Sequence, residues 1–318
     1  MLDRYDTLLF DLDGTLYRGE DVIPGAPEAI ATAHRAGNRV RYITNNASRG
    51  PDEVAAHLTD LGIPAQPDEV STSAQAGAAV TRSKLDAGAT VLVVGSPALV
   101  AELEAVGLRT TRAASDDVAA VVQGLSKDTG WRDLAEACVA IRAGALWVAC
   151  NVDPMLPTER GLLPGNGSMV AALRTATGAE PLVAGKPATP LITRAAEDAE
   201  NALVIGDRLD TDIAGAINAG LDSLLVLSGG NTAADVYQAD DRPTYIADDV
   251  AALTESPDRL RVAPQEGWQL DGNTVRGTGD PLALLRTLCA EPARGTLVAG
   301  DDTAHAALDH LDIPHELA

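Results

Sequence analysis

Short apolar runs alternate with longer segments of helical periodicity through most of this chain. Residues 7–12, 40–44 and 202–205 form apolar runs of strand length. Residues 26–36 carry the spacing of an amphipathic helix that ends at Gly37. Such alternation is typical of a mostly parallel sheet with helices on both faces, so the pattern predicts an α/β fold.

Residues 48–53 predict the start of another helix. Ser48 is a capping residue, Pro51 suits a first helical turn, and acidic residues follow, so a helix is expected over 52–61. A further helix is expected over about 71–85, where the first alternating series stops.

A second alternating series follows, and it has the pattern of an inserted domain. Its expected strands are 90–94, 119–122 and 146–149, and its expected helices are 97–106, 131–143 and 168–177. Residues 151–167 are rich in Pro and Gly and predict a long ordered loop. The first pattern then resumes with helices over 190–200 and 211–219 and strands over 202–205 and 223–227, followed by a short apolar run at 245–246 and a helix from Asp248.

From about residue 259 the pattern changes again. Asp271-Gly272-Asn273 is a hairpin turn signal between residues 268–270 and 274–276. One helix and a strand over 296–299 follow, which predicts a small α/β appendage.

Composition excludes several classes of protein. With 46% hydrophobic and 22% charged residues, the chain of 318 residues is typical of a soluble globular protein, and its apolar runs are too short to cross a bilayer. Its formal net charge of −22 argues against nucleic acid or an anionic membrane as the main partner. No signal peptide is visible at the N-terminus, and Cys138, Cys150 and Cys289 lack metal-ligand spacing, so reduced thiols in a cytoplasmic protein are expected.

Polar groups follow three of the expected strands and the apolar stretch 182–184, at the edge where open parallel sheets build active sites. They are Asp11 and Asp13, then Thr44-Asn45-Asn46, then Gly185-Lys186-Pro187, and finally Gly206-Asp207. A carboxylate beside an apolar core is costly unless something compensates its charge, so a site that uses two negative charges is one explanation for Asp11 and Asp13. A surface turn is the alternative for Asp11 and Asp13, whereas a calcium-binding EF-hand is excluded because no acidic ladder or terminal Glu follows Gly14.

These four segments resemble the motifs of the haloacid dehalogenase superfamily of phosphotransferases. D-L-D-G-T, T-N-N, G-K-P and G-D-R-L-D-T-D occur in that order, and the wide gap before Lys186 resembles the branch with a large α/β cap inserted after the second motif. The resemblance implies a Rossmann-like core with a parallel sheet over 1–85 and 184–258, a cap over 86–183, and a C-terminal appendage over 259–318. That appendage resembles a reduced acetyltransferase-like extension.

The resemblance also implies roles for the motif residues. Asp11 is expected to be the nucleophile that forms an aspartyl-phosphate, and Asp13 the general acid and then the general base. Lys186 is expected between the Asp11 carboxylate and the phosphate, where a compact ammonium reaches both. A Mg²⁺ site is implied for Asp11, Asp13 (through its carbonyl), Asp207 and Asp212. Phosphate binding is implied for Thr44, Asn45, Asn46 and Lys186.

The cap composition narrows the expected substrate. Residues 86–183 contain no Phe or Tyr and only two tryptophans, Trp131 and Trp147, the latter expected in the core. Because a base or pyridine ring usually stacks on aromatic side chains, a small hydroxylated phosphate ester is favoured. Arg160 and Asp153 are candidates to bind its hydroxyls or to close the cap.

The similarity is strongest to actinobacterial members that act on glycerol 3-phosphate, which implies that ester as substrate and a place in glycerol and glycerophospholipid metabolism. Pyridoxal phosphate, nucleoside monophosphates and phosphoglycolate are alternative substrates, and mutase or phosphotransferase activity would use the same core motifs. A non-catalytic interaction module on this fold is the alternative of another class, and it predicts the loss of a motif residue.

A homodimer is compatible with the sequence. His310 and His315 lack ligand spacing and are expected to be surface or packing side chains.

Overall fold

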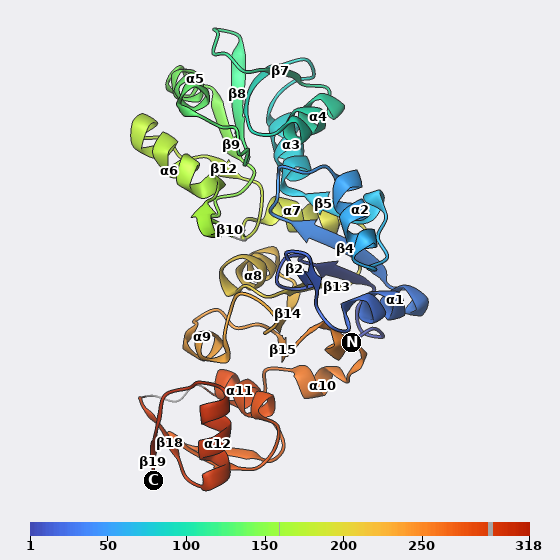
Figure 1. Cartoon of the computed structure of the whole chain (residues 1–318), viewed down its shortest axis with the longest axis vertical. Helices are drawn as coiled ribbons and strands as arrows, with labels where there is room; N and C mark the ends of the chain where they lie inside the picture. Colours follow the sequence, from blue (N-terminus) through green and yellow to red (C-terminus); the bar gives the residue numbers. More distant parts are fainter. Residues whose placement is uncertain (159, 292–294) are drawn as a thin grey trace. The chain divides into compact units, whose positions relative to one another are not determined.

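The computed structural model describes residues 1–158, 160–291 and 295–318 (Figure 1). The chain divides into two compact units. The first contains Met1–Val40 and Ala199–Ala318, and the second contains Arg41–Asp198. The predicted cap lies entirely within the second unit and the predicted appendage within the first. Within the described ranges, no helix is both long and apolar enough to cross a membrane.

Four parallel strands form the sheet of the first unit, in the order β15-β14-β13-β1. They are β1 (Thr7–Phe10), β13 (Ala202–Gly206), β14 (Asp222–Val226) and β15 (Tyr245–Ala247). Phe10 lies opposite Ile205, and the Asp11 N–H donates to the Ile205 carbonyl at 2.8 Å. Strands β1 and β13 therefore end level with each other, which places Asp11 and Asp207 at the same edge of the sheet.

Helices and short turns surround this sheet. They are α1 (Ala26–Ala36), α8 (Ala214–Ala219), α9 (Ala233–Gln238), the 3₁₀ turn η3 (Val250–Thr254) and α10 (Pro257–Leu260), with the small hairpin β2 (Tyr17–Arg18) and β3 (Asp21–Val22). The predicted helix over 211–219 begins instead with a π turn, η2 (Leu209–Ile213). The Arg208 carbonyl accepts from the N–H groups of both Asp212 and Ile213, at 3.0 and 3.1 Å. Such π turns are frequent at functional sites.

The appendage is a small α/β layer within the first unit. It contains β16 (Trp268–Asp271), β17 (Thr274–Gly277), α11 (Pro281–Ala290), β18 (Leu297–Ala299), α12 (Asp302–His310) and β19 (His315–Leu317). The strand order is β16-β17-β18-β19, and the predicted hairpin at Asp271-Gly272-Asn273 is confirmed. Its side chains Trp268 and Leu285 share one hydrophobic core with Leu225 and Ile246 of the main sheet. The appendage is thus packed against the sheet rather than tethered to it.

The second unit contains a five-stranded parallel sheet in the order β12-β9-β8-β6-β7. Its strands are β6 (Thr90–Val94), β7 (Arg109–Thr111), β8 (Val118–Gln123), β9 (Leu146–Ala149) and β12 (Leu182–Val183). Helices α3 (Ser73–Lys84) and α4 (Pro97–Ala105) cover one face, and α5 (Trp131–Arg142) and α6 (Asn166–Thr177) cover the other (Figure 1). Val91 and Val93 face the first pair of helices while Leu92 and Val94 face the second, because side chains alternate along a strand.

The rest of the second unit carries two of the motif segments. It contains most of β4 (Arg39–Thr44), α2 (Pro51–Asp60), the turn η1 (Pro67–Glu69), β5 (Val70–Thr72) and α7 (Thr189–Ala195). Strand β5, which was not predicted, pairs in parallel with β4. Helix α2 begins after Gly50, which provides no side-chain cap, so the predicted capping role of Ser48 is wrong.

The predicted loop over 151–167 was also wrong, because it contains an antiparallel hairpin. Strands β10 (Met155–Thr158) and β11 (Gly161–Pro164) pair with Leu156 opposite Leu163. Pro157 and Pro164 conceal this hairpin in the sequence, since proline lacks the N–H that a central strand needs. A two-stranded ribbon tolerates both residues because each strand has one unpaired edge.

The burial of the cysteines predicts their reactivity. Burial raises the pKa of the Cys150 thiol to about 12 and that of the Cys289 thiol to about 11, whereas Cys138 is only half-buried. Reactive thiolates are therefore scarce at pH 8 at two of the three cysteines. Intact-mass analysis after iodoacetamide treatment of native protein should show at most one adduct, and three after denaturation. Rapid double alkylation of native protein would contradict this packing.

Candidate active site

Three carboxylates of the first unit converge at the sheet edge. The ligand oxygens of Asp11, Asp207 and Asp212 all lie within 4.8 Å of one another. Asp207 and Asp212 are buried and Asp11 is half-buried. Three like charges at this separation repel strongly in a partly buried site, so the arrangement favours a bound cation. Hard carboxylate oxygens are the ligands that Mg²⁺ prefers.

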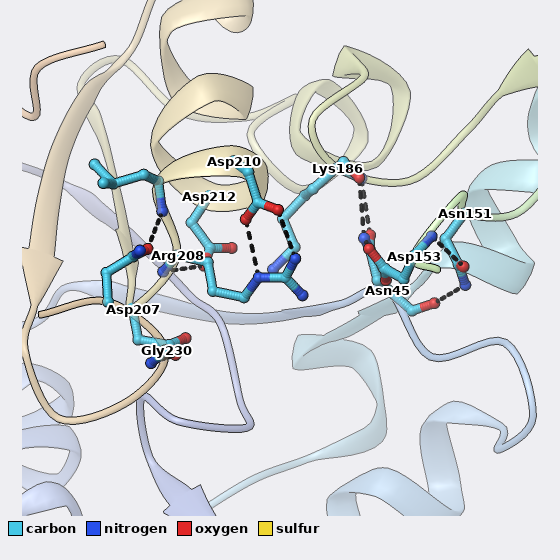
Figure 2. A network of polar contacts seen from close by, with 11 residues as sticks. Asn45, Asn151, Asp153, Lys186, Asp207, Arg208, Asp210, Asp212 and Gly230 are labelled. Carbon is cyan, nitrogen blue, oxygen red and sulfur yellow. Dashed lines mark hydrogen bonds and ion pairs between the residues drawn. The ribbon is translucent and has the colours of Figure 1, made fainter. Parts of the chain in front are cut away.

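Neighbouring groups fix two of these carboxylates. Asp207 accepts the Gly230 N–H at 2.5 Å, and Asp212 accepts the Arg208 N–H at 3.1 Å (Figure 2). Asp207 also accepts the Thr15 hydroxyl at 3.3 Å. These donors orient both side chains before any ligand arrives, as supporting hydrogen bonds do at metal sites. Thr15 and Gly230 received no role from the sequence, although Thr15 belongs to the D-L-D-G-T motif.

The Asp207 carboxylate lies where side chains on two neighbouring residues would be, and both of these residues are glycines. A Cβ on Gly14 would lie 2.3 Å from Asp207 Oδ2, and a Cβ on Gly229 would lie 2.1 Å from the same atom. Gly14 also has φ +89°, which disfavours any L side chain. A Cβ on Gly206 would likewise lie 2.3 Å from Asp212 Cγ. The glycines in D-G and G-D of the motifs are therefore explained by close approach to a carboxylate.

Asp13 lies in the turn after β1 and is exposed. The turn is held by the Leu12 carbonyl, which accepts from the N–H groups of Thr15 and Leu16 at 3.2 and 2.8 Å. The Gly14 carbonyl accepts the Ser228 hydroxyl at 2.8 Å. A rigid backbone thus presents an accessible Asp13 carboxylate two residues from Asp11.

Asn45 and Lys186 are joined within the second unit by two hydrogen bonds. The Lys186 N–H donates to Asn45 Oδ1 at 2.8 Å, and Asn45 Nδ2 donates to the Lys186 carbonyl at 2.9 Å (Figure 2). Lys186 is only 2% exposed, and its Nζ lies 3.4 Å from the Ile43 carbonyl. The Asn45 side chain is therefore a positioning group for Lys186, since it fixes both sides of the lysine backbone.

Further polar groups hold Asn45 in turn. The backbone carbonyl of Asn45 accepts from Asn151 Nδ2 and from the Ser73 hydroxyl, both at 2.6 Å. Its Nδ2 also donates to Asp153 Oδ2 at 3.1 Å. Asp153, which the sequence suggested for substrate hydroxyls, thus supports Asn45, and Asn151 and Ser73 join a network that sequence reasoning missed.

The remaining predicted residues lie in different surroundings. The buried Thr44 hydroxyl accepts the Asn46 N–H at 3.1 Å, while the Asn46 Oδ1 accepts from both the N–H and the hydroxyl of Ser48 at 2.7 Å. Arg160 is exposed in the turn between β10 and β11. Trp147 is buried, and its Nε1 donates to Gln123 Oε1 at 3.2 Å, which confirms its place in the core.

Comparisons with known proteins agree with these motifs. The profile of the haloacid dehalogenase-like hydrolases matches residues 8–109, and a second profile, described as HAD-hydrolase-like, matches residues 183–253. The chain is 51% identical to the D-glycerol 3-phosphate phosphatase of Mycobacterium tuberculosis, over 98% of this chain and 95% of that protein. The chain belongs to the haloacid dehalogenase-like hydrolases.

A solved structure and a second curated relative extend the comparison. A crystal structure of the glycerol phosphate phosphatase from M. tuberculosis in complex with magnesium superposes with a TM-score of 0.93, at 52% identity and 98% coverage of both chains. The acid sugar phosphatase of Staphylococcus saprophyticus is 36% identical over 78% of this chain and 96% of its own length. The predicted haloacid dehalogenase fold, with its parallel sheets and α/β composition, is confirmed.

The contact between Gly14 and Asp207 gives a test of the carboxylate cluster. Gly14→Ala adds a methyl group where Asp207 Oδ2 lies and strains a positive φ, so it should displace a predicted metal ligand. Gly19→Ala is the matched control, because Gly19 has φ +62° and nothing lies within 4 Å of its Cβ position. We expect Mg²⁺-dependent phosphatase activity to fall at least ~100-fold in Gly14→Ala, since ångström-scale misplacement costs about that factor. Equal activity of the two variants would contradict the close-approach argument.

Proposed function

We propose that this protein is a Mg²⁺-dependent phosphatase that hydrolyses glycerol 3-phosphate through an aspartyl-phosphate on Asp11. The observation that carries the proposal is the convergence of Asp11, Asp207 and Asp212 within 4.8 Å at the edge where two parallel strands end. The 51% identity to a glycerol 3-phosphate phosphatase over almost the whole chain supports the substrate.

The donor set fits magnesium. Asp11, Asp207 and Asp212 supply three carboxylates, and the Asp13 carbonyl is proposed as a fourth oxygen ligand. Bound Mg²⁺ would neutralise phosphoryl charge beside the Asp11 carboxylate. The hydrogen bonds to Asp207 and Asp212 hold these carboxylates in place, so little reorganisation is needed on binding.

The two motif aspartates have different proposed tasks. The Asp11 carboxylate attacks phosphorus, the ester bond to the glycerol oxygen breaks, and Asp13 protonates the departing alkoxide. Asp13 then takes a proton from water, which attacks the acyl-phosphate and releases inorganic phosphate and free Asp11. The exposure of Asp13 supports this role, because water must reach its carboxylate in the second step.

Phosphoryl binding is proposed for Lys186, Thr44, Asn45 and Asn46, on the strength of their match to the family motifs. Arg160 is proposed to contact the substrate hydroxyls from the hairpin turn. The scarcity of aromatic residues in 86–183 supports a small, hydroxylated leaving group over a nucleobase or pyridine ring.

No motif residue is missing, which disfavours the non-catalytic alternative. The cytoplasmic location, the homodimer and the domain limits predicted from the sequence stay predictions.

Replacement of the nucleophile tests the mechanism. Asp11→Asn keeps the side-chain shape but cannot form an acyl-phosphate, so phosphate release from glycerol 3-phosphate with Mg²⁺ should fall at least ~1000-fold. Asp21→Asn is the matched control, because Asp21 is an exposed aspartate in β3 outside the cluster, and it should keep wild-type turnover. Substantial turnover by Asp11→Asn would show that the covalent route is wrong.

A substrate panel tests the leaving group separately. Glycerol 3-phosphate should exceed pyridoxal phosphate, a nucleoside monophosphate, phosphoglycolate and a hexose phosphate in kcat/KM by at least ~10-fold, a margin that differential contacts to hydroxyls readily supply. Free phosphate should appear without an added acceptor, which distinguishes a hydrolase from a mutase. If another ester matched or exceeded glycerol 3-phosphate, the substrate would be reassigned while the phosphatase class remained.

A further inference from the structure

Two histidines and an aspartate form a second cluster near the C-terminus, in the appendage. Ligand atoms of His305, Asp309 and His315 all lie within 4.8 Å of one another. His305 Nδ1 lies 2.7 Å from His315 Nε2. Asp309 Oδ2 lies 3.5 Å from His305 Nε2, and Asp309 Oδ1 lies 3.8 Å from His315 Nε2. The sequence predicts His315 to be a surface or packing histidine, because its spacing from His310 does not suit metal ligands.

Two elements bring the three side chains together. His305 and Asp309 are four residues apart on α12, so they share one helical face. His315 begins β19, which pairs in parallel with β18 through Leu297 opposite His315. The turn between helix and strand is anchored by the buried Leu311 and Ile313. The cluster thus joins packed elements rather than loose chain ends.

The hydrogen bonds of His315 orient its free nitrogen toward the cluster. Its Nδ1 lies 2.9 Å from the Ile313 carbonyl, which only accepts, so Nδ1 carries the proton. In a neutral His315 ring, Nε2 is then an acceptor and faces His305 and Asp309. A histidine whose second nitrogen donates to a backbone carbonyl is the usual arrangement of a metal-ligating imidazole.

The two nitrogens of His305 face different neighbours. Its Nδ1 lies 2.7 Å from His315 Nε2 and its Nε2 lies 3.5 Å from the Asp309 carboxylate, so the three side chains turn donor atoms toward one another. A cation bound through one nitrogen of each imidazole and one Asp309 oxygen would be shared by all three.

We propose that His305, Asp309 and His315 bind a divalent transition metal of the zinc class, separately from the catalytic Mg²⁺. Two imidazoles and one carboxylate suit Zn²⁺, Co²⁺ or Ni²⁺, whereas Mg²⁺ prefers oxygen donors alone. Ligand atoms of a tetrahedral zinc site lie about 3.3 Å apart, given metal–nitrogen bonds of about 2.0–2.1 Å. One donor atom from each of the three side chains lies within 4.8 Å of the other two, and His315 Nε2 lies 3.8 Å from Asp309 Oδ1, so side-chain rotations can bring the donors to that spacing.

The surroundings leave an entry path for a metal ion and one coordination position without a protein ligand. The Asp309 side chain is 62% exposed while that of His315 is 7% exposed, which leaves an entry path for the ion on one side. Three protein ligands leave one coordination position for water. The bound metal would fasten β19 to α12 and stabilise the appendage, because it binds the folded arrangement only.

Metal binding can be measured on untagged full-length protein by equilibrium dialysis against Zn²⁺ in a large excess of Mg²⁺. Cobalt titration followed by visible absorption gives a second reading, since the d–d bands report nitrogen ligation. The variants are Asp309→Asn and the double variant His305→Gln with His315→Gln. His310→Gln is the matched control, because His310 ends the same helix and lies outside the cluster.

We expect one zinc per chain in wild type and in His310→Gln, at least ~10-fold weaker binding in Asp309→Asn, and loss of that site in the double variant. Zinc should raise the Tm of wild type but not of the double variant. Circular dichroism checks that each variant folds, and the exposed Asp309→Asn decides the question if the double variant does not. Equal zinc binding by wild type and Asp309→Asn, or none by wild type, would overturn the proposal without bearing on the phosphatase activity.

Discussion

The repulsion among three carboxylates at one sheet edge is the constraint on which the rest of the site depends. Asp11, Asp207 and Asp212 lie within 4.8 Å because β1 and β13 end in register and a π turn follows directly. Such an arrangement is unfavourable in a bare protein and becomes favourable when a cation is shared. The glycines and the donors Thr15 and Gly230 hold the carboxylates against their own repulsion.

In the second unit, hydrogen bonds likewise hold the residue that carries the positive charge, Lys186. Lys186 is buried, and its backbone is clamped on both sides by the Asn45 amide, which Asn151, Ser73 and Asp153 hold in turn. A flexible lysine would lose much side-chain entropy on each binding event, whereas a packed one has already lost it during folding. In both units the charged groups are thus preorganised by neutral hydrogen-bonding partners.

The packing of the appendage fixes the positions of the side chains proposed to bind a second metal. The appendage shares its hydrophobic core with the main sheet through Trp268, Leu285 and Leu225, so its elements are held firmly. That rigidity is what allows His305 and His315, ten residues apart, to face each other at hydrogen-bonding distance. On a loose tail, two histidines ten residues apart would have no fixed position relative to each other.

The sequence by itself determined the α/β class, most strands and the four polar strand ends, because hydrophobic period and motif order are local properties. It did not reveal the β10–β11 hairpin, whose prolines argue against strands, or the π turn before α8. Only the tertiary structure decided which donors orient Asp207, that Asp153 supports Asn45, and that His315 meets His305. These are contacts between residues that are not neighbours in the chain, and local patterns carry no information about which such side chains a fold brings within hydrogen-bonding distance.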